Sequence, residues 1–299
     1  MERFINPFSD MGFKRIFGQE ATKDLLIDFL NDLLEGEKTV TDITFLDKEI
    51  LPDFNEFRGA IYDIYCVNES GEHFIVEMQN GYQTYFRERA LFYLSHIITR
   101  QGRPGGDWHF DVKAVYGVFF MNFCLDDIPH KLRTDVILAD RETHEQFSDK
   151  LRFIFIELPY FHKREDECNT NFDKWIYTLK NMETLKTIPF KDRKKVFKKL
   201  EKTVDLASMT PEERDRYEES IKVYRDYVNT IEDTSHRSWR KGRMEGRAEG
   251  HREGRAEGHR EGRVEGKIEM ARNMKAEGLP LTLISKVSGL SVEEIEKLS

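Results

Sequence analysis

Two acidic residues lie within two neighbouring runs of β-favouring residues, in the stretch IYDIYCVNESGEHFIVEMQ that spans residues 61–79. A short turn containing Gly71 separates the runs, so the stretch predicts an antiparallel hairpin with a three-residue loop. With that loop length, Asp63 lies directly opposite Glu77. Because strand side chains alternate between the two faces of a sheet, Gln79 lies on the same face as Glu77.

Two carboxylates in this arrangement need a compensating charge. Like charges directly opposite each other destabilise a strand pair, and two nearby carboxylates raise the pKa of one of them. Two carboxylates beside a neutral oxygen donor suit a hard divalent cation such as Mg²⁺, with Mn²⁺ or Ca²⁺ as alternatives. The other interpretation is that both acids are solvated on an exposed sheet face and pair with arginines, for which the candidates are Arg58, Arg87 and Arg89.

Four segments of the chain resemble the PD-(D/E)XK nucleases: NPFSDMGFKRIFG, FRGAIYDIYCV, FIVEMQ and YFRERALFYLSHIITRQ. More closely, they resemble the Rpn-type branch of recombination-promoting nucleases and putative transposases, which is found in bacteria. The resemblance covers about residues 1–165. It implies an α/β, restriction-endonuclease-like core, a mixed sheet flanked by helices. It also implies a magnesium-dependent DNA endonuclease linked to DNA recombination and transposition.

Under this resemblance Asp63 and Glu77 are the metal ligands, and Gln79 takes the place of the lysine in the superfamily motif. A lysine ammonium can stabilise developing negative charge or help to activate water, whereas a glutamine can only form hydrogen bonds. We therefore expect Gln79 to orient the attacking water, while positive charge comes from the metal ion or from another residue.

Further candidates for the site lie in the first predicted helix and in a helix predicted over residues 84–99. Asp10 and Lys14 are four residues apart, on one helical face, although Asp10 is at least as well explained as a helix cap. Arg89 and Tyr93 share a face with His96 and Arg100, and this face either follows a phosphate backbone or is an ordinary solvated face. The charge donors proposed from the sequence are Lys14, Arg58, Arg87 and Arg89, and the DNA-contact candidates are Arg58, Arg87, Arg89 and Tyr93.

The elements that position these residues alternate between helix and strand. Leucines and phenylalanines at helical spacing predict an amphipathic helix from about residue 22 to 34, followed by a strand over residues 40–51. After the hairpin and the helix at 84–99, two nearly continuous apolar runs at 112–123 and 151–158 predict central strands covered on both faces. This order fits the nuclease core.

The composition is that of a globular protein with a charged tail. The 299 residues include 22 Phe and 11 Tyr, enough for a substantial core, and the net charge is −8. Such a balance argues against general electrostatic attraction to nucleic acid, so a nuclease would depend on a local basic patch and on metal. Three scattered cysteines give no zinc or disulfide pattern, and no signal peptide or membrane span is evident. We expect a cytoplasmic protein.

The rest of the chain is divided into a helical extension, a repeat and a small module. We assign residues 1–170 to the nuclease-like domain, 171–235 to a helical extension, 236–270 to a charged repeat and 271–299 to a helix-turn-helix-like module with Ser291 as a cap. In the repeat a glycine recurs at every fourth position, as G-[RH]-x-E. The repeat is either a linker or a self-association helix through which a homo-oligomer, such as a dimer, forms.

Two functions from different classes are compatible with these patterns. The first is a metal-dependent DNA endonuclease that uses Asp63, Glu77 and Gln79. The second is a non-catalytic protein that retains the nuclease fold and self-associates through its C-terminal tail. The paired acids favour the first, whereas the missing lysine and the acidic net charge favour the second.

Overall fold

The computed structural model describes residues 2–47, 49–50, 60–105, 109–125, 130–191 and 194–298. The chain divides into two compact units, Met1–Thr230 and Ile231–Ser299. Within the described ranges, no helix carries an apolar stretch long enough to cross a membrane. The first unit contains the sheet and the acidic pair.

The described part of the first unit contains a six-stranded mixed sheet with strand order β1-β4-β5-β6-β8-β7. Its strands are β1 Ile43–Phe45, β4 Ile64–Asn68, β5 His73–Gln79, β6 Val115–Met121, β7 Arg133–Ala139 and β8 Gln146–Glu157. Strands β5, β6 and β8 are parallel, and the other pairs are antiparallel. β2 Glu49–Ile50 and β3 Ala60–Ile61 form a separate antiparallel pair. The predicted mixed α/β fold is confirmed.

The hairpin of β4 and β5 has the predicted register. Val67 pairs with His73, and Tyr65 pairs with Ile75. Gly71 has φ +77°, a left-handed conformation that glycine adopts without steric cost. The loop therefore fixes which residues of the two strands lie opposite each other.

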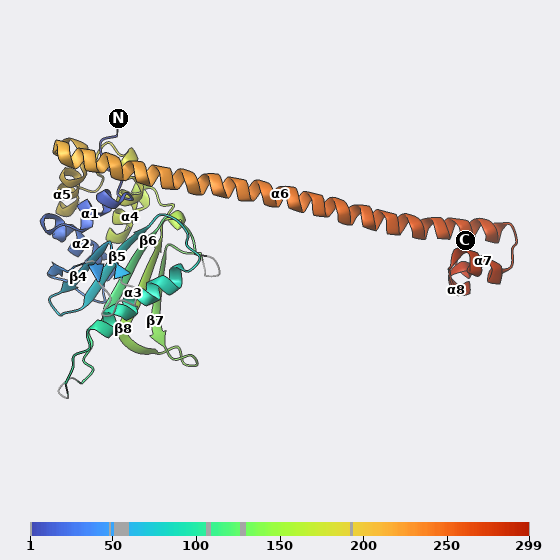
Figure 1. Cartoon of the computed structure of the whole chain (residues 1–299), viewed down its shortest axis with the longest axis horizontal. Coiled ribbons are helices and arrows are strands. Elements are labelled where there is room, and N and C mark those ends of the chain that lie inside the picture. The colour runs from blue at the N-terminus through green and yellow to red at the C-terminus, as the bar shows by residue number, and fades with distance from the viewer. Residues whose placement is uncertain are drawn as a thin grey trace. The chain divides into compact units, whose positions relative to one another are not determined.

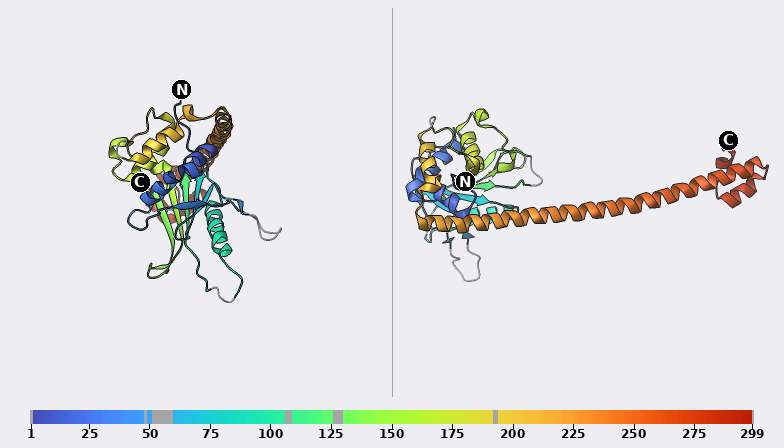
Figure 2. Two further views of the ribbon diagram at one scale, coloured as in Figure 1. Left: turned by 90° about the vertical axis from the view of Figure 1, so that its left-hand side faces the viewer. Right: turned by 90° about the horizontal axis from the view of Figure 1, so that it is seen from above.

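Helices cover both faces of this sheet (Figures 1 and 2). On one face, a large apolar cluster joins the sheet to α1 Asp10–Phe17, α2 Lys23–Leu33, α4 Asn171–Asn181 and α5 Lys195–Val204. The other face packs against α3 Phe86–Arg100 through residues such as Phe86, Leu94 and Ile97. Both faces of β6 are therefore buried, as expected for a nearly continuous apolar strand.

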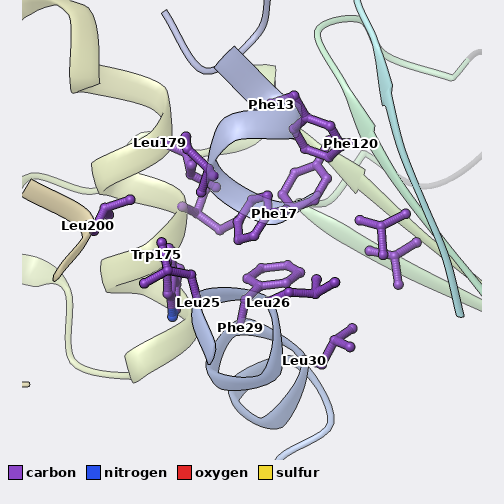
Figure 3. Close-up of a cluster of buried hydrophobic side chains, with 14 of the residues drawn as sticks. Phe13, Phe17, Leu25, Leu26, Phe29, Leu30, Phe120, Trp175, Leu179 and Leu200 are labelled. Carbon is purple, nitrogen blue, oxygen red and sulfur yellow. The ribbon is translucent and has the colours of Figure 1, made fainter. Parts of the chain in front are cut away.

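Aromatic rings form the centre of the larger cluster (Figure 3). The ring of Phe29 lies 5.1 Å from that of Phe120 and 5.5 Å from that of Phe17, and Trp175 lies 5.7 Å from Phe17. Trp175 belongs to α4 and Phe197 to α5, and both are fully buried. The helices after residue 170 thus complete the core of the sheet domain.

Three local features differ from the sequence-based expectation. The strand expected over residues 40–51 is present as two short strands, β1 and β2, which pair with β4 and β3 respectively. Strand β7 was not predicted, because it is an edge strand with exposed residues and lacks a buried apolar run. The cap of α1 is Ser9, whose hydroxyl accepts a hydrogen bond from the Gly12 amide at 3.1 Å, so Asp10 is not the cap.

The second unit consists of helices in its described part. Helix α6, Pro211–Ala276, begins within the residues of the first unit, contains the whole glycine repeat and is exposed along it. A small apolar cluster of Ala271, Ile284 and Ile295 joins its end to α7 Leu281–Ser288 and α8 Val292–Glu296. Ser291 caps α8 as predicted, since its hydroxyl accepts a hydrogen bond from the Glu294 amide.

Gly117 in β6 allows α3 to pack closely, and this generates a first prediction. A Cβ atom at Gly117 would lie 2.6 Å from a ring carbon of Phe119 and 2.7 Å from Cδ1 of Leu94. We expect Gly117→Ala to lower the free energy of unfolding by about 1–3 kcal/mol because of overpacking. Chemical denaturation followed by tryptophan fluorescence measures this.

The matched control is Gly250→Ala, because, apart from its chain neighbours and the backbone of its own helix, no atom lies within 4 Å of a Cβ atom at that position. This control should leave the unfolding midpoint of the sheet domain unchanged. If Gly117→Ala has the same midpoint as the wild type, close packing at β6 does not limit the position of α3.

Candidate functional site

The β4–β5 hairpin holds the two acids against each other. Asp63 lies immediately before β4, and Glu77 lies near the end of β5. The amide of Asp63 donates a hydrogen bond to Oε1 of Glu77 at 3.1 Å, and the amide of Met78 donates to Oδ2 of Asp63 at 2.9 Å. The backbone amide of Asp63 thus holds the carboxylate of Glu77, and the amide of the residue after Glu77 holds the carboxylate of Asp63.

Gln79 connects this pair to a cation. Its Nε2 donates a hydrogen bond to Oε2 of Glu77 at 3.0 Å, and its Oε1 accepts one from Nη2 of Arg89 at 2.5 Å. An amide can do both at once because it carries a donor and an acceptor. A lysine at this position could not accept the bond from Arg89.

Glu77 lies under α3 and away from bulk solvent. Glu77 is only 4% exposed. Burial raises the pKa of Glu77 to about 8, and the negative charge of Asp63 adds to this effect, while hydrogen bonds and Arg89 oppose it. The interpretation of two acids solvated on an exposed face is therefore wrong for Glu77, because α3 covers the face that carries it.

Arg89 is held in place by the rings around it. Its guanidinium carbon lies 5.5 Å from the ring centre of Phe86 and 5.8 Å from that of Tyr93, within the range of cation–π attraction. Phe86 is itself buried in the cluster beneath α3. The helix therefore positions a cation beside the acids that the hairpin supplies.

A cleft of about 800 Å³ opens beside Gln79. Asp10 and Lys14 line it together with Gln79, and they form an ion pair with each other along α1. Arg87 is exposed and lines a neighbouring hollow at the start of α3. Arg58, the remaining candidate from the sequence, lies outside the described residues. The structure thus places Asp10, Lys14 and Gln79 around one cleft.

The chemistry of the donors fits a hard divalent cation. Asp63 and Glu77 offer carboxylate oxygens, and Mg²⁺ commonly uses one or two carboxylates together with waters and substrate phosphates. In the described part of the chain, no group of three or more His, Cys, Asp or Glu side chains gathers into a larger metal cluster. Asp63 and Glu77 are therefore the residues that would hold such an ion.

Glu157 is a buried acid that the sequence analysis did not select. It ends β8 and lies in register with Met121 of β6, which in turn is in register with Gln79. Its Oε2 accepts a hydrogen bond from the Leu125 amide at 2.7 Å, and burial raises its pKa. The signal in the sequence is an acid that ends an apolar run, as in FIVEMQ.

The raised pKa of Glu77 predicts a pH dependence of stability when no divalent cation is present. Between about pH 4.5 and pH 8 the folded protein holds a proton that the unfolded chain has lost. Stability should therefore fall as the pH rises through this window, by roughly 1–4 kcal/mol for this group. Glu77→Gln should flatten the dependence, measured by denaturation in a chelator at several pH values.

Glu145→Gln is the control, because Glu145 is exposed in the turn before β8. This variant should keep the pH dependence of the wild type. A Glu77→Gln variant with the same slope as the wild type would show that Glu77 is ionised in the folded protein at neutral pH.

Comparison with known proteins agrees with this geometry. No curated protein and no solved structure gave a match to the chain. A family model described as "PD-(D/E)XK nuclease family transposase" matches residues 7–234, which is most of the chain and includes the sheet, α3 and the acidic pair. The protein therefore belongs to the PD-(D/E)XK nuclease family transposases.

Proposed function

We propose that the protein is a metal-dependent DNA endonuclease. Its site residues for the hydrolysis of phosphodiester bonds would be Asp63, Glu77 and Gln79. The observation that carries this proposal is a pair of carboxylates, one of them buried, that are held by backbone amides and joined through Gln79 to Arg89. Membership of a nuclease family supports the same reaction class. The role in DNA recombination or transposition that we propose rests on the family alone.

Asp63 and Glu77 would hold a divalent cation, for which we propose Mg²⁺. Such an ion supplies Lewis-acid charge for phosphodiester hydrolysis when it is bound. The hydrogen bonds from the amides of Asp63 and Met78 keep both carboxylates oriented before any ligand arrives. Preorganisation of this kind lowers the cost of forming the charged site.

Gln79 and Arg89 would together replace the lysine of the superfamily motif. Arg89 supplies the positive charge, and its guanidinium can bind two phosphate oxygens at once. Gln79 holds that guanidinium beside Glu77 through its own side-chain oxygen. Lys14 would be a second source of charge in the cleft, where Asp10 now neutralises it.

DNA would reach the site from the surface around α3 and the cleft. We propose that Arg87, Arg89 and Tyr93 contact it, because all three belong to α3, the helix that covers the acids. We also propose that the protein forms a homo-oligomer through α6, since the exposed glycines of the repeat leave room for a second chain. This association is independent of the hydrolytic site.

Replacement of either acid tests the nuclease function directly. We expect Asp63→Ala and Glu77→Ala each to reduce nicking of supercoiled plasmid with Mg²⁺ at least 100-fold, because the loss of one carboxylate removes half of the protein ligands to the metal. Agarose gels of a time course measure the rate.

Glu142→Ala, in the exposed turn after β7, is the control and should cleave like the wild type. Equal cleavage by all four proteins would place the activity elsewhere. Inactivity of the wild type with Mg²⁺, Mn²⁺ and Ca²⁺ would favour the interaction-protein hypothesis.

The proposed role of Arg89 leads to a rescue experiment. We expect Arg89→Ala to lower the cleavage rate about 10- to 1000-fold because it removes a cation beside the reacting phosphate. The double variant Arg89→Ala, Gln79→Lys should recover part of this loss, since it restores the motif lysine. Single-turnover cleavage at saturating Mg²⁺ measures both rates. A double variant slower than Arg89→Ala alone would exclude charge replacement.

A further inference from the structure

A stripe of aromatic side chains that includes one arginine runs along α3. Tyr85, Arg89, Phe92 and His96 recur at spacings of three or four residues, so they lie on one face of the helix. Tyr85 is 74% exposed and Phe92 is 42% exposed. The ring of Phe92 stacks on that of His96 at 5.9 Å. Two rings of this size on the surface are not accounted for by the packing of the fold.

A hollow of about 580 Å³ lies along this stripe. Its walls are the aromatic rings of Tyr85, Phe92 and Tyr93, the guanidinium of Arg89, and the polar side chains of Gln83, Thr84 and Glu88. Arg89 belongs to both places, because it lines the hollow and donates a hydrogen bond to Gln79 of the acidic site. Whatever occupies the hollow therefore lies next to the reacting centre.

Unpaired nucleobases match these walls. Proteins that bind single strands use aromatic side chains as stacking platforms and arginines as partners for the backbone. In an intact duplex the bases stack on one another and expose only their edges in the grooves. Rings such as Tyr85 and Phe92 can stack only on a base that has left the duplex.

We propose that the hollow along α3 binds unpaired bases of the DNA substrate by stacking on Tyr85 and Phe92, so that the enzyme acts on single-stranded or locally unpaired DNA. This inference rests on the proposed nuclease function and specifies its substrate. Arg89 would hold a phosphate next to the stacked base, which places that phosphate near Gln79. Glu88 lines the same hollow and repels phosphate, which confines the backbone to the side of Arg89.

Binding of fluorescein-labelled oligothymidylate to the full chain in a chelator tests the proposal without cleavage. We expect Tyr85→Ala and Phe92→Ala each to weaken this binding about 5- to 100-fold, the range found for loss of one base-stacking ring. Tyr85→Phe should bind like the wild type because it keeps the ring. Leu91→Ala is the matched control, since Leu91 is an exposed apolar residue of the same helix at 52% exposure but does not line the hollow.

The same variants are compared on a duplex of equal length and in sedimentation. The proposal requires a smaller loss of affinity for the duplex than for the single strand, with melting temperatures and hydrodynamic mass unchanged. Equal losses for both forms, no loss for either, or an equal loss for Leu91→Ala would overturn it. A change of hydrodynamic mass with Tyr85→Ala would overturn it as well, because a second copy of the chain would then occupy this face.

Cleavage of plasmid distinguishes failure of this inference from failure of the proposed function. If plasmid nicking depends on Asp63 while the ring variants bind single strands normally, the nuclease function stands and the stacking site is wrong. If the ring variants lose affinity for single strands but no protein cleaves, the stacking site stands and the nuclease function is wrong.

Discussion

The burial of one carboxylate beside another is the constraint on which this site depends. Glu77 lies on the sheet face that α3 covers, opposite Asp63, and it is almost fully removed from solvent. Burial and the neighbouring charge both oppose its ionisation. A protein that needed only a stable hairpin would gain from an apolar residue here, since a buried carboxyl group is costly whether it ionises or is forced to keep its proton. A cation bound by both carboxylates would offset this cost.

The surrounding fold is organised to hold this pair rigidly. The parallel strands β5, β6 and β8 lie in the middle of the sheet, and aromatic rings fill the core behind them. On the opposite face, α3 brings Arg89 over the end of β5, where Gln79 links it to Glu77. Short, local hydrogen bonds from backbone amides and from one side-chain amide thus hold the reactive groups in position.

The sequence predicted the part of the site that depends on neighbouring residues. The glycine turn and the alternation of side chains gave the register that brings Asp63 opposite Glu77, and the hairpin has that register. The contact between Arg89 and Gln79 depends on how α3 packs on the sheet, which no local pattern encodes. The same is true of the burial of Glu77 and Glu157, and of the formation of the exposed edge strand β7. Tertiary packing decided each of them.

Direct titration of a divalent cation tests the central claim, which is that Asp63 and Glu77 form a binding site for one ion. Isothermal titration calorimetry with Mn²⁺ compares the wild type with Asp63→Asn and Glu77→Gln, which keep the shape of each side chain but lose its charge. We expect binding of about one ion to the wild type and at least 10-fold weaker binding to each variant. Equal binding to all three proteins, or none to the wild type, would contradict it.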